Sequence, residues 1–300
     1  MFSYDHSHDE LNFSGTNIER NFYELEFARP ENKTDIIVEL AKKIPWQNPV
    51  IDVVEKLSDP TLRLSSRNYV NEIHSERVNF SLKLIAEKGH TNNYNDLEQG
   101  IFLLSSMGDP TATYKKFKET LDKLAYRLNE LFQLNQIILT DDVKVHLLSR
   151  VLYQEEGFNG NQIYYHEPDN SFVTKVLENK LGIPISLSVV YILVGMRLGL
   201  PLYGINLPLH FMLYYESNDF TTFVDPFNAG VLIDKQTCIR FLEANGYKDI
   251  PEYFSKASTL TILKRMYNNL INIYKKTGPE EMEMMLLKQL TILENKTRFT

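Results

Sequence analysis

The chain has 300 residues, of which 43% are hydrophobic and 12% aromatic, and its formal net charge is -7. This composition supplies a core for one large or two to three smaller domains and excludes a chain that is disordered throughout. Nucleic acids and anionic membranes attract clustered lysine and arginine, so the acidic balance argues against both as partners.

Cys238 is the single cysteine of the sequence. One thiol forms no internal disulfide and no multi-thiolate metal site. The first residues contain neither a basic start nor an apolar run, so we expect no export signal. We therefore expect a cytoplasmic protein without a cofactor or a bound metal.

The N-terminal part of the chain changes character near residue 34. Residues 1–33 contain scattered aromatic side chains without a sustained period, which predicts an arm that is disordered or docks weakly. Apolar residues at helical spacing follow, broken by prolines, and predict short helices up to about residue 110. We expect a helical N-terminal layer over residues 34–140.

The clearest helix of this layer begins at Tyr114. Its apolar residues recur at steps of three and four and form a seam that must pack on other helices: Tyr114, Phe117, Leu121, Leu124, Leu128 and Leu131. Another helix is expected after Thr140, where Asp141 and Asp142 suit the positive N-terminal end of a helix.

Residues 141–235 are expected to form the core of the protein. Between Ser186 and Leu198 the only charge is Arg197, so this helix has no polar face and should be buried on all sides. At about 13 residues it is too short to span the roughly 30 Å of a membrane's hydrocarbon core.

Three segments after this helix are rich in β-branched, leucine and aromatic residues and are separated by Pro208 and by residues 216–219. They are expected to be strands over 202–206, 210–215 and 221–224. A buried helix on a small antiparallel sheet predicts an α+β core, with helical parts before and after it.

Residues 236–300 are expected to be helical. A short helix over 234–245 ends at Gly246, and two further apolar patterns meet at Gly278 and Pro279. The resulting hairpin resembles one tetratricopeptide unit in length and pairing, although a single unit shows no repeat period.

Several motifs of the central region occur together: GFNGN at 157–161, Asn170-Ser171, GIPISLS at 182–188, Arg197-Leu198-Gly199, Pro208-x-His210-Phe211 and Asp225-Pro226-Phe227. Together they resemble the transglutaminase-like core of the SirB-type family, whose relatives include certain F-box proteins. The resemblance extends over roughly residues 96–295. It implies a transglutaminase or papain-like core followed by tetratricopeptide-like helices.

In catalytic members of such families, as the resemblance implies, a cysteine at the start of the central helix attacks an acyl group. A histidine on the next strand is its base, and an aspartate on the following strand orients that histidine. His210 and Asp225 take these two places, and we expect them on adjacent strands within hydrogen-bond reach. The place of the cysteine falls near Pro184, with Ser186 as the nearest hydroxyl.

This chain departs from the family pattern in further ways. Leu209 and Ala229 stand where the family usually has glycine, and each adds a side chain beside the expected cleft. The SirB-type branch as a whole resembles a version of the fold that has lost the cysteine, so its absence agrees with that branch.

The candidate site residues fall into two groups. His210, Asp225 and Ser186 are the candidate catalytic residues. Residues expected to shape the cleft or its loops are Gly160, Asn161, Asn170, Pro184 and Asn228. Simpler roles stay open: His210 can be a core-edge histidine, Asp225 can start a turn, and Asn170 can cap the helix that begins near Phe172.

The preferred function is a cysteine-less, non-catalytic module that binds a peptide or protein or regulates one. The alternative is an acyl hydrolase, transferase or protease-like enzyme in which Ser186 or a water attacks while His210 acts as base and Asp225 orients it. A purely structural helical scaffold is the third possibility.

Overall fold

The structure is a computed structural model that describes residues 16–89, 93–134, 139–248 and 250–294. The chain divides into two compact units, one ending at Arg77 and the other beginning at Val78. All candidate site residues belong to the second unit. The domain boundaries expected from the sequence stay predictions, because a division into compact units does not show which segments fold independently.

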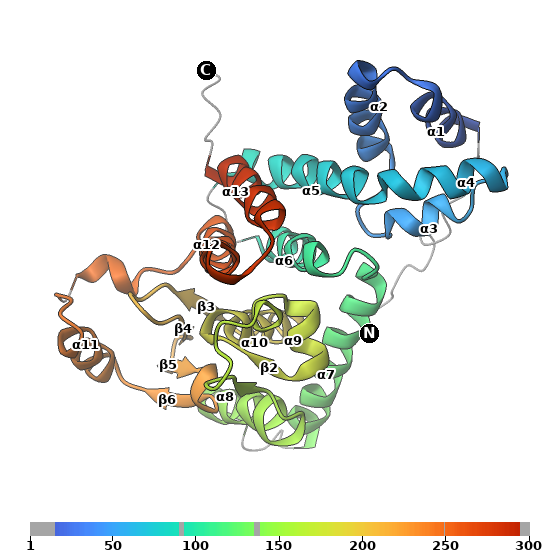
Figure 1. The fold of residues 1–300 in the computed structure, drawn as a ribbon. Coiled ribbons are helices and arrows are strands. Elements are labelled where there is room, and N and C mark those ends of the chain that lie inside the picture. The colour runs from blue at the N-terminus through green and yellow to red at the C-terminus, as the bar shows by residue number, and fades with distance from the viewer. Residues whose placement is uncertain (1–15, 90–92, 135–138, 249, 295–300) are drawn as a thin grey trace. The chain divides into compact units, whose positions relative to one another are not determined.

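From residue 16 onward the first unit consists of helices and the turns that connect them, drawn mainly in blue in Figure 1. They are α1 (Thr16–Phe27), α2 (Pro30–Lys43), α3 (Val50–Val54), α4 (Pro60–Ser66), the 3-10 turn η1 (Arg67–Tyr69) and the start of α5 (Val70–Glu87). Pro30 and Pro60 occupy the first turns of their helices, where proline removes no intrahelical hydrogen bond. Asp59 caps α4 by accepting hydrogen bonds from the backbone N–H groups of Thr61 and Leu62.

The N-terminal arm predicted over residues 1–33 differs from the structure in its second half. Residues 1–15 lie outside the described residues, but the chain is helical from Thr16 onward. Ile18, Phe22 and Leu25 recur at steps of four and three, and Phe22 and Leu25 are buried in the core of this unit. This helical spacing of apolar residues predicts a helix where an arm was expected.

Three helices follow the end of α5 in the second unit: α6 (Tyr94–Gly108), α7 (Tyr114–Leu134) and α8 (Asp141–Ser149). A π-helical stretch, η3 (Arg150–Glu155), continues α8. The seam predicted for α7 is confirmed, since Phe117, Leu121, Leu124, Leu128 and Leu131 are all buried.

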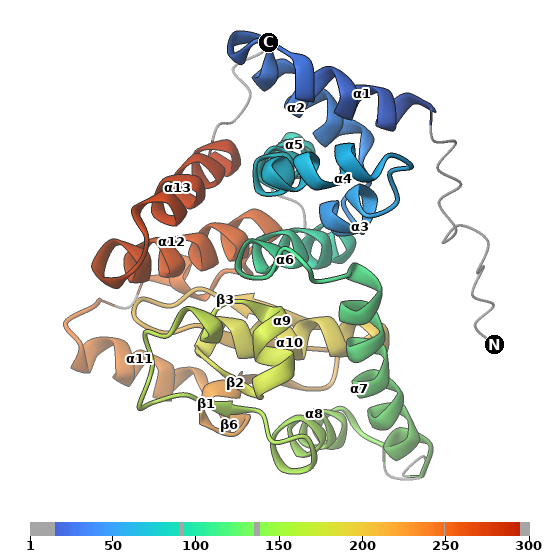
Figure 2. The same ribbon diagram turned by 45° about the vertical axis from the view of Figure 1, so that its right-hand side comes forward.

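The central helix is α10 (Pro184–Arg197), and every residue from Pro184 to Gly195 is buried, as predicted. Two parallel bridging strands, β1 (Asn159–Gly160) and β2 (Leu181–Gly182), and two short helices, η4 (Pro168–Asn170) and α9 (Val173–Asn179), lead into it. Figures 1 and 2 show α10 in the middle of this unit, with α9 beside it.

The sheet has the order β3-β4-β5-β6, and all neighbouring strands are antiparallel. Its strands are β3 (Leu202–Ile205), β4 (Met212–Glu216), β5 (Thr221–Asp225) and β6 (Val231–Ile233). The three predicted strands are confirmed, but the second begins at Met212 and leaves His210 in the preceding loop. The strand β6 was not predicted, because it is too short to show an alternating pattern in the sequence.

Helices cover both ends of this core. A small cluster that includes Met212, Phe223, Cys238 and Leu242 joins the sheet to α11 (Lys235–Ala244) and to the 3-10 turn η6 (Pro251–Phe254). The predicted hairpin is formed by α12 (Thr259–Thr277) and α13 (Glu280–Glu294), which lie side by side in Figures 1 and 2, with α6 next to α12.

The architecture is therefore α+β: mostly helical, with a central buried helix on a small antiparallel sheet and helical parts before and after it. Within the described residues, no helix combines the length and the apolar character that crossing a membrane requires.

Arg197, at the end of α10, ties three helices together. Its guanidinium donates to Glu98 of α6 at 2.7 Å and to Asp122 of α7 at 2.6 Å. Glu98 is buried and also accepts a hydrogen bond of 2.7 Å from the Tyr114 hydroxyl. The motif residue Arg197 thus has a structural role in fixing α10 against the helical layer.

Candidate functional site

His210 and Asp225 form a hydrogen-bonded pair, as predicted. Nε2 of His210 lies 2.9 Å from Oδ2 of Asp225. Asp225 is the last residue of β5, and Leu213 of β4 pairs with Val224 of β5, so the start of one strand lies beside the end of the other. The expectation that both residues lie on strands is wrong for His210, which lies in the loop before β4, where its backbone N–H donates to the carbonyl of Leu207.

Asp225 accepts hydrogen bonds at both of its oxygens. Oδ1 accepts from the backbone N–H groups of Phe227 and Asn228, and Oδ2 accepts from His210 and from the side-chain amide of Asn228 at 2.8 Å. Asp225 therefore caps the 3-10 turn η5 (Pro226–Asn228) and orients His210 at the same time. The turn role and the pairing role are compatible.

The pKa of Asp225 reflects these contacts. Burial by itself would raise the pKa of this carboxyl group, which is 4% exposed. The hydrogen bond and charge of His210 and the donors of Asn228 outweigh burial and hold the pKa below its ordinary value. Asp225 is thus an anion at neutral pH, and it fixes the orientation of the imidazole.

The pair leaves one ring nitrogen of His210 for other chemistry. Because Nε2 faces Asp225, Nδ1 is the atom that can take up or donate a proton outward. The His210 side chain is 15% exposed. This arrangement can polarise a water or a donor group, or it can bind a polar group of a partner.

Leu209 and Ala229 flank this pair and share an unusual backbone conformation. Their φ angles are +66° and +62°, in the left-handed region that favours glycine. The resemblance implies glycine at both positions, and these φ angles agree with that expectation. The Leu209 side chain is 56% exposed and stands beside His210.

This strain gives a testable order of stabilities. Leu209→Gly should be more stable than Leu209→Ala by about 1 kcal/mol, because a Cβ atom disfavours this φ angle. Both variants remove the same exposed side chain, so Leu209→Ala is the matched control. Urea unfolding of both proteins measures the difference, and a more stable alanine variant would show that the left-handed conformation is not kept in solution.

Ser186 is engaged away from His210. Its side chain is completely buried, and Oγ donates to the carbonyl oxygen of Asn170 at 2.5 Å. Oγ also accepts a hydrogen bond of 3.0 Å from the backbone N–H of Ile183, the residue before the helix. Pro184 is the first residue of α10 and is buried. The nearest hydroxyl to the expected nucleophile position is thus hydrogen-bonded to backbone groups at the N-terminus of α10.

Asn161 and Asn170 hold the loop between β1 and α9. The side-chain amide of Asn161 donates to Oδ1 of Asn170 at 3.2 Å, and that of Asn170 donates to the carbonyl of Tyr164 at 2.6 Å. The helix cap predicted for Asn170 is wrong: the N-cap residue of α9 is Phe172, without a side-chain bond, and Ser105 accepts from the N–H of Val173. The Asn170 side-chain oxygen, the atom that a cap would use, accepts from Asn161 instead.

Gly160 lets this loop approach the histidine pair. A Cβ atom at Gly160 would lie 2.6 Å from the ring of Phe227 and 2.7 Å from its carbonyl oxygen. Only glycine permits this contact. The loop-shaping residues and the His210–Asp225 pair are thus two networks that meet at Phe227.

A row of aromatic rings extends from this meeting point. Phe227 lies 6.1 Å from Tyr165 and 6.3 Å from His210, and His210 lies 6.1 Å from Phe241 of α11, all measured between ring centroids. Tyr165 is 36% and Phe241 39% exposed. We call Tyr165, Phe227, His210 and Phe241 the ring row. Its members come from four separate segments, so no spacing in the sequence could have revealed it.

Cys238 does not supply a nucleophile to this site. It is 2% exposed on α11, and its Sγ lies 3.9 Å from the sulfur of Met212. Burial, followed by the charges of Asp234 and Asp225, raises the pKa of the thiol to about 11. A thiol that stays protonated at neutral pH is a poor nucleophile.

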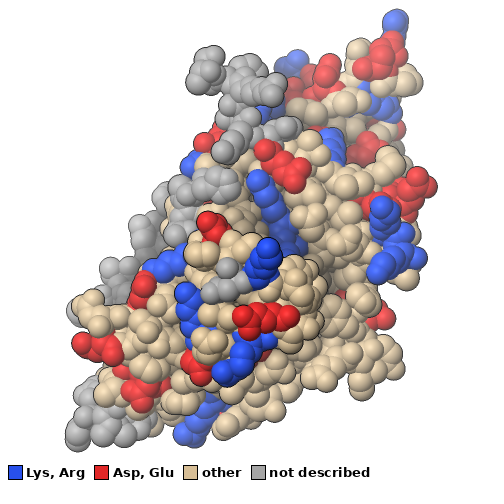
Figure 3. All heavy atoms as spheres, turned by 90° about the vertical axis from the view of Figure 1, so that its left-hand side faces the viewer, with Lys and Arg blue, Asp and Glu red and all other residues tan. Residues whose placement is uncertain are grey.

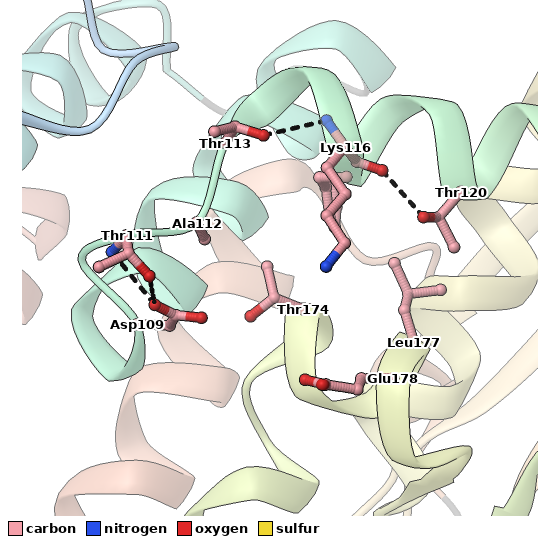
Figure 4. A pocket seen from close by; sticks show the side chains of 10 residues that line it. Asp109, Thr111, Ala112, Thr113, Lys116, Thr120, Thr174, Leu177 and Glu178 are labelled. Atoms are coloured by element: carbon pink, nitrogen blue, oxygen red, sulfur yellow. Dashed lines mark hydrogen bonds between the residues drawn. The ribbon is translucent and has the colours of Figure 1, made fainter. Parts of the chain in front are cut away.

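Two cavities lie away from the pair. One of about 270 Å³ lies between α7, α9 and the segment 109–113, and Figure 4 shows the Lys116 side chain extending toward Thr174 and Glu178 in it. The other, of about 550 Å³, lies over β4, β5 and β6 and includes Phe223 and Phe254 in its lining. Neither is lined by His210, Asp225 or Ser186. In the part of the chain that the structure describes, no three His, Cys, Asp or Glu side chains gather as metal ligands.

Comparison with known families gives a match over this core. The model of the transglutaminase-like superfamily matches residues 115–268. That range begins at α7 and ends within α12, and it includes His210 and Asp225. No solved structure matches the chain.

Similar proteins come from bacteria and mammals. A UPF0162 protein of Xylella fastidiosa is 35% identical over 142 residues, which are 45% of this chain and 50% of that protein. A UPF0162 protein of Vibrio cholerae is 32% identical over 120 residues, 39% of this chain and 44% of that protein. F-box only protein 21 of Mus musculus is 27% identical over 177 residues, 56% of this chain and 28% of that protein. The chain thus spans about half the length, or less, of the relatives it matches.

Proposed function

Because this chain belongs to the transglutaminase-like superfamily, we propose that it is a SirB-type, cysteine-less member that binds a peptide or protein segment instead of forming an acyl-enzyme. The binding surface is the ring row together with the His210–Asp225 pair. The α12–α13 hairpin is the tetratricopeptide-like part that follows such a core.

One observation carries this proposal: neither Pro184 nor Ser186, the residues at the expected nucleophile position, offers a free nucleophile. Pro184 has no nucleophilic atom, and the Oγ atom of Ser186 is buried between the Asn170 carbonyl and the Ile183 N–H group. A hydroxyl that closes a helix start in this way is not aimed at a substrate. Activating serine also demands more of its base than activating cysteine, because the pKa of serine is higher.

Exposed apolar side chains support a binding role. Leu209 and Phe241 are 56% and 39% exposed beside His210, while Ile163 and Tyr164 are 85% and 64% exposed on the loop that carries Tyr165. Exposed apolar groups that gather in one region mark interaction sites more often than scattered ones. Rigid aromatic rings are the usual anchors of such interfaces.

Charge supports a protein partner over a nucleic acid or a membrane. Basic and acidic side chains are interspersed on the face shown in Figure 3. The net charge of -7 also argues against binding to a nucleic acid or an anionic membrane. A single, buried thiol fits a cytoplasmic location.

The second candidate function is hydrolysis by an activated water. It is favoured by the intact pair: Asp225 is ionised and holds the imidazole so that Nδ1 can accept a proton from a water. The Ser186 route lacks such support, because its hydroxyl is used within the helix start.

The test removes exposed rings from the ring row. Tyr165→Ser and Phe241→Ser should each weaken binding of short apolar peptides at least about tenfold, since a buried aromatic anchor contributes well over 1 kcal/mol. Binding is measured by fluorescence polarisation with N-terminally labelled pentapeptides that carry leucine or phenylalanine at their three central positions. Thermal unfolding should be nearly unchanged because both rings are substantially exposed.

Tyr126→Ser is the matched control, since Tyr126 is a 66% exposed tyrosine on α7. It should leave peptide binding unaltered. If no peptide binds the wild type, or if all three variants bind equally well, the ring row is not a binding surface.

A further inference from the structure

The cavity between α7, α9 and the segment 109–113 combines apolar, hydroxyl and charged side chains in its lining. Phe117 and Leu177 contribute the buried apolar part. The volume is about 270 Å³, and a water molecule occupies about 30 Å³ of the liquid, so a ligand of roughly nine non-hydrogen atoms has room there. This is the size of a small metabolite.

Three hydroxyl groups of the lining are already hydrogen-bonded within the protein. The Thr111 hydroxyl donates to Oδ1 of Asp109 at 2.6 Å, and the Thr120 hydroxyl donates to the backbone carbonyl of Lys116 at 2.8 Å. The Thr113 hydroxyl accepts from the backbone N–H of Lys116 at 3.2 Å. Figure 4 draws these contacts as dashed lines. They hold the start of α7 in place and do not require a ligand.

The hydroxyl of Thr174 differs from these three. Its Oγ1 atom is buried, and none of the described residues forms a hydrogen bond with it. In Figure 4 this side chain points into the cavity from α9. A buried hydroxyl without a hydrogen bond is unfavourable, because it has lost its water and gained no partner. A ligand with a polar group at this point would supply the missing partner.

Lys116 and Glu178 bring opposite charges to the same cavity, one from α7 and the other from α9 (Figure 4). In the described part of the chain, no carboxylate forms an ion pair with Lys116, and Glu178 pairs with Lys175 alone, at 3.3 Å through Oε2. The other carboxylate of the lining, Asp109, is bound by Thr111 and lies 3.6 Å from Nζ of Lys175. An ammonium group and a carboxylate oxygen thus face the cavity without being joined to each other.

From these groups we propose that the cavity binds a free aliphatic α-amino acid. The carboxylate of the ligand accepts hydrogen bonds from the Lys116 ammonium and the Thr174 hydroxyl, and its ammonium group donates to Glu178. Its side chain packs on Phe117 and Leu177. Leucine, with about nine non-hydrogen atoms, has a suitable size.

The charges select a zwitterion over a singly charged ligand. A simple anion in this cavity would lie close to the carboxylate of Glu178, and a simple amine would lie close to the ammonium of Lys116. Such like-charge contacts disfavour a wrong ligand more than they change the binding of the right one. The inference concerns a site separate from the ring row and does not depend on peptide binding there.

Isothermal titration calorimetry with the full chain compares three probes that share one carbon skeleton. They are L-leucine, leucinamide, which lacks the carboxylate, and 4-methylpentanoate, which lacks the ammonium group. Wild type should bind leucine at least about tenfold more tightly than either analogue, because each analogue leaves one charged group of the cavity without its partner.

Lys116→Met and Glu178→Gln should each weaken leucine binding at least about tenfold. Thr174→Val should also weaken it, but should not lower the midpoint of thermal unfolding, because a methyl group of similar shape replaces a hydroxyl without a partner. Lys115→Met is the matched control: it removes one positive charge from an exposed neighbouring residue of α7 that does not line the cavity, and it should leave leucine binding unaltered.

Three results would overturn the inference. The first is the absence of leucine binding to wild type at millimolar concentrations. The second is binding of 4-methylpentanoate or inorganic phosphate as tight as that of leucine, which would reveal a simple anion site. The third is leucine binding that persists in Lys116→Met and is lost in Phe241→Ser, since the ligand would then lie at the ring row.

Discussion

Arg197→Met should destabilise the second unit by about 3 kcal/mol, the low end of the range for removing one partner of a buried ion pair. Glu98 is 4% exposed and would lose its guanidinium partner, while the hydroxyl of Tyr114 still donates to it. Methionine fills a similar volume, so the loss measures the charge and its hydrogen bonds rather than a cavity. Urea unfolding at neutral pH measures the change.

Two further variants isolate the cause of that loss. Arg127→Met removes an arginine whose ion pairs with Glu130 and Glu155 are exposed, and it should change stability little. The double variant Arg197→Met with Glu98→Gln should recover part of the lost stability, because the buried charge is gone. Equal losses in Arg127→Met and Arg197→Met would contradict the structural role of the Arg197 network.

Asp225→Ala should lower the free energy of unfolding by about 2–3 kcal/mol at neutral pH, because it removes a buried acceptor from the partly buried donors of His210 and Phe227. Asn228 is exposed, so its donors can turn to water. Asn228→Ala is therefore the milder control, which removes one donor and leaves the carboxylate bound to His210. Chemical unfolding of both variants measures these losses.

The pH dependence of the Asp225→Ala effect has a defined sign. The folded-state pKa of Asp225 is lowered, so its ionised form stabilises the fold above the ordinary carboxyl pKa of about 4. That contribution is lost as the pH falls through the folded-state pKa. The difference between wild type and Asp225→Ala should therefore shrink below about pH 4; a difference that grows there would show that Asp225 is protonated in the folded protein.

Local sequence signals were sufficient for the core elements. The uninterrupted apolar character of α10 predicted its burial, and the seam of α7 predicted its packing face. The pairing of His210 with Asp225 followed from the resemblance and from the short connection between β4 and β5. These features depend on residues close in sequence or on a shared motif.

Contacts between distant segments were not predictable in the same way. Asn170 was expected to cap α9, but its side-chain oxygen accepts a hydrogen bond from Asn161, a contact that forms only in the folded loop. Ser186 was a candidate catalytic residue, but its hydroxyl binds the backbone of Asn170 and Ile183, contacts that no spacing in the sequence indicates. The rings of the ring row come together from separate elements, so the sequence held no spacing that could reveal them.

The central claim is that this site binds peptides without acyl transfer, and product formation tests it most directly. Wild type, His210→Ala and Ser186→Ala are incubated with the labelled pentapeptides and with activated aryl esters. Mass spectrometry follows both the products and the mass of the protein. We predict that wild type and His210→Ala form products no faster than the reaction without protein, and that no covalent adduct forms. Products formed by wild type but not by His210→Ala, or an adduct that disappears in Ser186→Ala, would contradict the account.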